Sequence, residues 1–349
     1  MKLKVNMYSF FYIILFMITG LKTTAQTNYK NIVLEGGGIR GFAYIGAYEV
    51  LDSLHILKSI ERVGGSSAGA IQAALLAVGY TPAEMKIIAE TIPLKKFNDG
   101  GWSIIGGTRR LNKQFGWYKG DGFANWIGEL IAKKTGSTNT TFAELHARKA
   151  EKGFKDLYVT GTDLTYQCLR IFSYEQYPNM SIRDAVRISM SIPLYYKPVL
   201  IDDSGLMCSK TEQNKIIHVM VDGGVLSNYP IHMFDSTKYS ATFDSINTFY
   251  SNPETLGILL ERSDQIKHSS QNSGVAPVDI KKMKQFYSAL YFTLVDRPNP
   301  ELMNASVIKR TISIDNLNLS PRVRKLDART VKSLINSGHT GALHFFKLN

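Results

Sequence analysis

The chain has 349 residues, of which 44% are hydrophobic and 20% are charged. This composition is typical of a globular protein with one large domain or two ordinary ones, and it excludes a disordered chain. The sequence shows no fixed-period repeat, which excludes a solenoid. The formal net charge is +12, but no nucleic-acid-binding motif accompanies it, so we expect no nucleic-acid partner.

The amino-terminal segment predicts export. Lys2 and Lys4 precede the apolar stretch MYSFFYIILFMITGL, and small residues up to Ala25 form a cleavage signal. The apolar stretch is shorter than the roughly 20 residues that a membrane-spanning helix needs. We therefore expect residues 1–25 to be a signal peptide and the mature protein to be periplasmic or secreted, with an uncleaved membrane anchor as the alternative.

Strands and helices are predicted to alternate along the rest of the chain, which favours the α/β class with a mostly parallel sheet. In such sheets, ligands bind at the carboxyl ends of the strands. The expected strands lie at residues 31–34, 59–63, 155–164, 216–224 and 255–262. The expected helices lie at residues 42–54, 70–80, 82–92, 123–134 and 181–191.

The carboxy-terminal quarter is basic. Residues 265–349 contain 13 Lys or Arg against 5 Asp or Glu, and we expect them to form an extension packed on or following a larger α/β domain at 26–264. The basic residues alternate with apolar ones, as in IKKMKQFYSALYF. They would form either a solvated helix face or a peripheral contact with an anionic membrane. The sequence does not indicate an oligomeric state.

A glycine-rich loop, LEGGGIRG, separates the first expected strand from the first helix. Gly36, Gly38 and Gly41 fit the pattern G-x-G-x-x-G, and a loop in this place offers free backbone N–H groups to an anion. The anion would be a cofactor pyrophosphate in a dinucleotide-binding oxidoreductase, with Glu61 at the ribose. Alternatively, it would be the oxyanion of an acyl-transfer reaction, formed transiently next to a nucleophile.

A second turn contains GSSAG, in which Gly65 and Gly69 flank a central Ser67. A serine at a sharp strand-to-helix turn adopts a strained backbone conformation, and small residues two positions away on each side permit the close approach of neighbouring backbone. The pattern predicts a nucleophile elbow with Ser67 as the nucleophile. Ser66 fits less well, because Gly64 and Ala68 would then flank it.

Ser67 needs a base, and the sequence offers two kinds. In a conventional triad the base is a histidine, for which His218 and His232 are the candidates. Alternatively, Asp222 follows the apolar strand IIHVMV and precedes two glycines, so its carboxylate would lie at the carboxyl end of a strand and take the proton directly.

The blocks GGGIRG, GSSAG and DGG, in this order and each after an apolar strand, resemble the three signature blocks of the patatin-like phospholipase family. Segments 116–131, 159–165 and 187–199 also resemble this family, and the similarity spans about residues 31–262. The resemblance implies a three-layer α/β/α sandwich with a mostly parallel central sheet. It also implies hydrolysis of phospholipids or other lipid acyl esters through an acyl-serine intermediate, with no metal and no cofactor.

The resemblance also implies roles for individual residues. Ser67 matches the nucleophile and Asp222 the aspartate of a Ser-Asp dyad. The remaining matches are the oxyanion-hole residues Gly36, Gly37, Gly38 and Arg40, the elbow residues Gly65 and Gly69, and Gly223 and Gly224 of the DGG motif. Arg40 would either reinforce the loop or extend to solvent. A catalytically silent protein on the same fold is the third hypothesis, although every reactive residue is present.

Residues 98–122 are rich in glycine and aromatic residues and show no clear periodicity. Such a segment is typical of a lid or binding loop, and we expect it to supply much of the substrate pocket. Tyr195 and Tyr196 would either line that pocket or pack in the core. Cys168 and Cys208, the only cysteines, would form one disulfide or lie separately as small hydrophobic residues.

Overall fold

A computed structural model describes residues 28–100, 104–209, 216–240, 251–269, 276–283, 285–286, 289–290, 293 and 305–348. The expected signal peptide lies outside these residues. Among the residues described, no helix combines the length and the apolar character needed to cross a bilayer.

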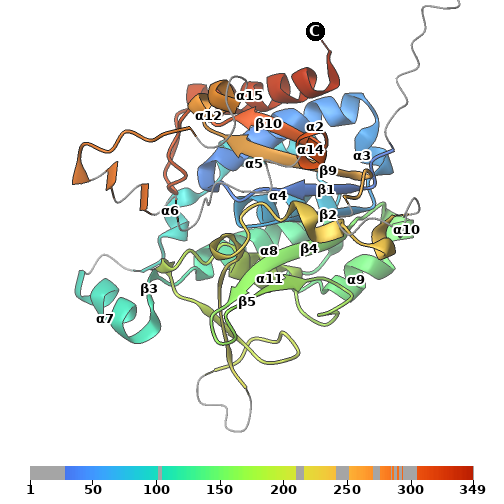
Figure 1. Cartoon of the computed structure of the whole chain (residues 1–349). Coiled ribbons are helices and arrows are strands. Elements are labelled where there is room, and N and C mark those ends of the chain that lie inside the picture. The colour runs from blue at the N-terminus through green and yellow to red at the C-terminus, as the bar shows by residue number, and fades with distance from the viewer. Residues whose placement is uncertain are drawn as a thin grey trace, which may run out of the picture.

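The centre of the protein is an eight-stranded sheet in which β10, β9, β1, β2 and β4 run parallel (Figure 1). β8 and β5 both pair antiparallel with β4, and β7 pairs antiparallel with β8. The predicted α/β class with a mostly parallel central sheet is confirmed. The strands are β1 (Asn31–Leu34), β2 (Arg62–Gly65), β4 (Asp156–Asp163), β5 (Cys168–Phe172), β7 (Val199–Ile201), β8 (His218–Asp222), β9 (Thr255–Glu261) and β10 (Thr311–Asp315).

Side chains of the strands alternate between two apolar layers, because successive residues of a strand point to opposite faces. Ile32 and Leu34 belong to the larger core on the first face, whereas Val33 belongs to a smaller core on the second. The first face is covered by long helices, including α2 (Ala43–Ser53), α4 (Ala68–Ala77) and α15 (Ala328–Phe346). The second is covered by η3 (Ile231–Phe234) and α14 (Ala305–Ile308).

The remaining elements pack around this frame. The helices are η1 (Gly38–Phe42), α3 (Ile56–Ser59), α5 (Pro82–Thr91), α6 (Leu94–Phe97), α7 (Ile104–Gln114), α8 (Asp121–Thr135), α9 (Phe142–Ala147), α10 (Lys149–Lys152), α11 (Ile182–Ser189), η2 (Gly223–Val225), η4 (Thr237–Tyr239) and α12 (Ser263–Ser269). A separate two-stranded sheet consists of β3 (Gly116–Tyr118) and β6 (Leu194–Tyr196).

Among the described carboxy-terminal elements, β10 and α15 contribute side chains to the core. β10 pairs with β9 over five residues, so the expected domain boundary at residue 264 falls between two paired strands. Figure 1 shows α15, in red, beside the blue α2. The two helices approach closely because a Cβ added to Gly338 would lie 1.7 Å from the Ala43 carbonyl oxygen, and one added to Gly46 would lie 1.8 Å from that of Ile335.

Residues 98–122 are more regular than their sequence indicates. Within this segment lie α7, β3 and the beginning of α8, and α7 packs against β3. The contact depends on glycine, since a Cβ at Gly107 would lie 2.5 Å from the Trp117 ring.

Tyr196 is fully buried and packs in the core. Within the described chain no disulfide joins Cys168 to Cys208.

Candidate active site

Ser67 lies in the sharp turn between β2 and α4. Its backbone has φ 50° and ψ −119°, a region that residues other than glycine rarely adopt. Neighbouring backbone is very close: a Cβ at Gly65 would lie 2.7 Å from the Gly69 carbonyl carbon, and one at Gly69 would lie 2.5 Å from the Leu34 carbonyl oxygen. The two glycines therefore allow the turn to pack against the end of β1.

The Ser67 hydroxyl donates a hydrogen bond of 2.8 Å to Oδ2 of Asp222. β4 brings these residues together, because it pairs with β2 along its first half and with β8 along its second. Gly65, at the end of β2, lies opposite Val159, and Asp222, at the end of β8, lies opposite Gly161. β2 and β8 are two inter-strand spacings apart, or roughly 9.6 Å, and the Ser67 and Asp222 side chains meet across this gap.

The Asp222 carboxylate is held from several sides. It is only 3% exposed, and its Oδ1 accepts a 2.8 Å hydrogen bond from the Gly224 N–H. Its own N–H donates to the Ser191 carbonyl oxygen at 3.0 Å. Gly223 allows the turn, since a Cβ there would lie 2.2 Å from the Thr160 hydroxyl oxygen. The DGG sequence thus fixes the carboxylate with Oδ2 directed at Ser67.

The glycine loop presents unused donors beside Ser67. A Cβ at Gly36 would lie 3.1 Å from the Ser67 Cβ, which places the loop against the serine. Within the part of the chain described, the N–H groups of Gly37 and Gly38 have no hydrogen-bond acceptor. The neighbouring N–H groups all donate to carbonyl oxygens: Gly36 to Asn228, Ile39 to Pro321 and Arg40 to Gly37. Two donors therefore remain for an anion at this site.

Arg40 reinforces the loop and does not extend to solvent. It is 4% exposed, and its Nε donates a 3.0 Å hydrogen bond to the Gly37 carbonyl oxygen, which also accepts from the Arg40 N–H. In a trans peptide, the carbonyl and the following N–H point in opposite directions. Because Arg40 binds the Gly37 carbonyl oxygen, the Gly38 N–H of the same peptide points away from Arg40.

Two parts of the site were missed by sequence reasoning. Ser189, at the end of α11, accepts a 2.9 Å hydrogen bond from the Ser67 N–H and so supports the strained turn. Ala68, directly after the serine, has an N–H with no acceptor among the described residues, and it begins α4. Ser189 could have been found because segment 187–199 resembles the patatin-like family. Ala68 could have been found because the residue after the serine of a nucleophile elbow supplies an oxyanion-hole N–H.

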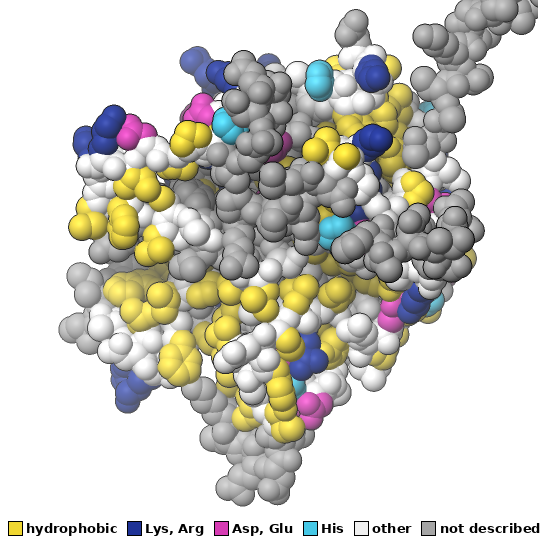
Figure 2. Space-filling view, in the orientation of Figure 1, with side chains coloured by type: hydrophobic (Ala, Val, Ile, Leu, Met, Phe, Trp, Pro, Cys, Tyr) yellow, Lys and Arg dark blue, Asp and Glu magenta, His cyan; other side chains and the backbone are white. Residues whose placement is uncertain are grey.

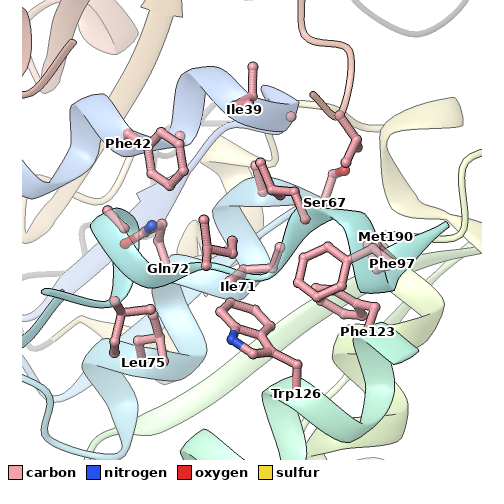
Figure 3. A pocket seen from close by; sticks show the side chains of 18 of the residues that line it. Ile39, Phe42, Ser67, Ile71, Gln72, Leu75, Phe97, Phe123, Trp126 and Met190 are labelled. Atoms are coloured by element: carbon pink, nitrogen blue, oxygen red, sulfur yellow. The ribbon is translucent and has the colours of Figure 1, made fainter. Parts of the chain in front are cut away.

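An apolar pocket extends from Ser67 along α4 (Figure 3). Its empty volume, including the solvent-filled space at its open side, is about 800 Å³. Among the described lining residues, Ser67 carries a hydroxyl, Gln72 a carboxamide and Trp126 an indole ring with one N–H. Apolar lining residues include Ile39, Phe42, Ile71, Leu75, Phe97, Phe123 and Met190.

The described walls of the pocket are not where the sequence placed them. They come mainly from η1, α4, α5, α6, α8 and the residues after α11, and no described residue of 98–122 lines the pocket. Tyr195 is not among the described lining residues, and its hydroxyl donates a 2.7 Å hydrogen bond to Asn98 Oδ1. One lining residue, Val323, comes from the segment that joins β10 to α15. A Cβ at Gly38 would lie 1.9 Å from the Pro321 carbonyl oxygen, so this segment packs on the glycine loop.

The histidine candidates are engaged with other aspartates. His218, at the opposite end of β8 from Asp222, has Nδ1 2.7 Å from Asp163 Oδ2 and Nε2 2.9 Å from Asp203 Oδ1. His232 lies in η3 with Nδ1 2.5 Å from Asp235 Oδ2. The structure therefore brings the carboxylate of Asp222, and not a histidine ring, to the Ser67 hydroxyl.

Burial and neighbouring charges shift the pKa values of His218 and Asp163. Burial alone would lower the pKa of His218, but hydrogen bonds to Asp203 and Asp163 outweigh it and raise the pKa above its ordinary value. Burial would raise the pKa of Asp163, whereas His218, the Tyr166 N–H and Arg170 lower it overall. This cluster is thus an ion-pair network with both signs of charge present.

The dinucleotide hypothesis does not fit the sheet. Glu61 directly precedes β2, where its carboxylate forms an ion pair with Lys30 at 2.9 Å. β1 and β2 are parallel and in register, so Glu61 lies at the amino end of the strands and the glycine loop at the carboxyl end. An acidic residue that binds a ribose would have to lie at the carboxyl end.

Two solved structures share this fold. VipD from Legionella pneumophila superposes with a TM-score of 0.55 at 16% identity, covering 92% of this chain and 67% of VipD. ExoU, in its heterodimeric complex with SpcU from Pseudomonas aeruginosa, superposes with a TM-score of 0.51 at 18% identity. That comparison covers 92% of this chain but only 51% of the matched chain in the ExoU–SpcU complex.

Sequence comparison identifies closer relatives. Protein R571 of Acanthamoeba polyphaga mimivirus is 31% identical over 292 residues, covering 78% of this chain and 89% of R571. A protein of Invertebrate iridescent virus 6 named probable lipid hydrolase 463L is 28% identical over 236 residues, covering 64% and 71%. The family profile described as Patatin-like phospholipase matches residues 32–235. The chain therefore belongs to the patatin-like phospholipase family.

Proposed function

We propose that this protein hydrolyses lipid acyl esters, of the phospholipase A or lysophospholipase type, through a dyad of Ser67 and Asp222. Membership of a lipid-hydrolase family supports the reaction class. The observation that carries the mechanism is the 2.8 Å hydrogen bond from the Ser67 hydroxyl to Asp222, at the edge of an apolar pocket. A nucleophile, a base and a site for an acyl chain are thus adjacent.

In the first step, the Ser67 Oγ attacks the ester carbonyl carbon while its proton passes to Asp222 Oδ2. The carbonyl π electrons move to oxygen, and the N–H groups of Gly37, Gly38 and Ala68 stabilise the resulting oxyanion. When the carbonyl re-forms, the bond to the alcohol breaks. The alcohol oxygen takes the proton from Asp222, which leaves an acyl ester on Ser67.

In the second step, water replaces the alcohol. Asp222 accepts a proton from the water as its oxygen attacks the acyl carbon, and the same backbone donors hold the second oxyanion. Collapse of this intermediate breaks the bond to Ser67 Oγ, which recovers its proton from Asp222. The products are a fatty acid and the regenerated serine. Each proton removed by the carboxylate is returned, so the dyad needs no further base.

The acyl chain would lie along one side of α4. Ser67, Ile71 and Leu75 follow one another at helical spacing and line the pocket. Eight residues of helix rise roughly 12 Å, which sets the scale of the chain that the pocket receives. Because almost every lining side chain is apolar, we propose that binding energy comes mainly from the buried hydrocarbon of the substrate.

We propose that the enzyme meets its substrate at a lipid surface. Leu194 is 67% exposed, two residues after Ile192 of the pocket wall. Figure 2 shows apolar side chains, in yellow, gathered across the middle of the face in view. The net positive charge would add attraction to an anionic membrane. Export, proposed from residues 1–25, is checked by the amino-terminal sequence of protein recovered outside the cytoplasm.

The test of the function is a panel of phospholipid, lysophospholipid and short-chain ester substrates, hydrolysed by wild type beside Ser67→Ala. We expect wild type to release fatty acid and Ser67→Ala to lose this activity by roughly 10⁴-fold or more. An active-site serine probe should label wild type alone. A folded wild type that neither labels nor hydrolyses any ester would identify a catalytically silent protein and contradict the proposal.

A further inference from the structure

Gln72 is an unexplained polar group in the acyl pocket. It lies on α4, is 7% exposed, and its Oε1 is buried without a hydrogen-bond partner. Within the described chain, neither end of its carboxamide makes a hydrogen bond, so the observation does not depend on which end is assigned as oxygen. A buried polar group of this kind needs a partner, and the dyad mechanism gives it none.

The surroundings of Gln72 are apolar. In the view of Figure 3 its carboxamide lies between Phe42 and Leu75, both of which line the pocket. An unsubstituted hydrocarbon chain placed here would cover the carboxamide and leave its donors and acceptor unpaired. That loss costs about 1–3 kcal/mol, which corresponds to roughly 5–150-fold in affinity. The pocket is therefore a poor match for an acyl chain without a polar substituent.

A hydroxyl group matches the carboxamide, because it donates to Oε1 and accepts from Nε2 at the same time. Gln72 is five residues beyond Ser67, or roughly 7.5 Å along the helix axis. An extended chain advances by about 1.2 Å per bond, which places the matching oxygen near the sixth carbon from the ester. We propose that Gln72 selects acyl chains that carry a hydroxyl near this position. This inference rests on the proposed function.

The experiment compares two esters that differ in one oxygen: p-nitrophenyl octanoate and p-nitrophenyl 6-hydroxyoctanoate. The readout is the ratio of their kcat/KM values in wild type, Gln72→Leu and Gln72→Met. As a matched control, Ile88→Leu changes another pocket-lining side chain without changing its polarity. We expect wild type to favour the hydroxylated ester by about tenfold, and both Gln72 variants to favour the plain ester. The ratio in Ile88→Leu should remain that of wild type.

A binding measurement separates this proposal from the proposed function. Ser67→Ala, with and without Gln72→Leu, is titrated by calorimetry with octanoic acid and with 6-hydroxyoctanoic acid. Tighter binding of the hydroxy acid that disappears with Gln72→Leu supports the proposal even if no ester is hydrolysed. If wild type shows no preference, or if Gln72→Leu leaves the ratio unchanged, Gln72 is satisfied by water in the pocket and the proposal is wrong.

Discussion

The two ends of β8 carry the same kinds of residue in different settings. At one end, Asp222 accepts a hydrogen bond from a neutral hydroxyl beside an apolar pocket. At the other, His218 lies between the carboxylates of Asp163 and Asp203, and Arg170 donates to Asp163. The second cluster balances its charges internally and has no strained serine. Aspartate and histidine in proximity therefore do not identify a catalytic site; a nucleophile facing a substrate pocket does.

Replacing the aspartate at the pocket should have the largest effect. Asp222→Asn keeps the shape of the side chain but removes the proposed base, so we expect kcat/KM for esters to fall roughly 10⁴-fold with little change in melting temperature. The measurement is ester hydrolysis beside thermal unfolding. A variant that retains more than a tenth of wild-type activity would show that Asp222 is not the base.

Gly38→Ala should have the next largest effect. The position has φ +55°, and the new Cβ would collide with the Pro321 carbonyl oxygen, so the Gly38 N–H must move. Loss of one oxyanion donor lowers kcat by about 10²–10³-fold. Gly136→Ala is the matched control, since φ there is +90° but nothing lies within 4 Å of the added Cβ. Equal losses of activity in the two variants would point to backbone strain alone.

Leu75→Phe should change specificity by a smaller amount. Leu75 lines the pocket two helical turns beyond Ser67, and a larger side chain there shortens the space for the acyl chain. Overpacking of this size costs about 1–3 kcal/mol. We therefore expect kcat/KM to fall about tenfold for long acyl esters and to remain unchanged for butyryl esters. Equal losses on both would place the chain elsewhere.

His218→Gln should affect stability and leave catalysis intact. The raised pKa of His218 means that its stabilisation is fully present below about pH 6.5 and is lost as pH rises through the folded-state pKa. The lowered pKa of Asp163 means that its contribution is present above about pH 3.8 and is lost at lower pH.

The measurement for this variant is the difference in unfolding free energy between wild type and His218→Gln across pH. It should be about 1–3 kcal/mol near pH 5.5 and smaller near pH 9. Loss of esterase activity as large as that of Asp222→Asn, in a folded His218→Gln protein, would restore the conventional triad.

The sequence predicted the parts of the site that depend on local geometry. Gly36 to Gly38, Ser67 and Asp222 each lie where a strand ends in a tight turn, and such turns have specific residue requirements. The sequence could not predict that β4 pairs with both β2 and β8, because strand pairing is a long-range property. Ser189 was missed for the same reason, since its partner lies far away along the chain.

The described pocket walls differ from the prediction for another reason. Residues 98–122 contain many glycines, which obscure the helical periodicity of α7. The true walls on α5 and α8 were predicted as helices, but their apolar residues were indistinguishable from core residues. Gln72 likewise interrupts an otherwise apolar helix without any motif. Pocket shape depends on how helices pack, and a single sequence does not specify that packing.

The packing of α15 on α2, and of Pro321 on the glycine loop, has a consequence for biosynthesis. A ribosome makes the Ser67 elbow early and the segment with Pro321, Val323 and α15 late, and chains begin to fold while they are still being made. Until the late segment arrives, the Ile39 N–H lacks its acceptor and α2 lacks its contact with α15. We therefore expect a nascent chain to have no esterase activity, which would protect the lipids of the cell that makes it.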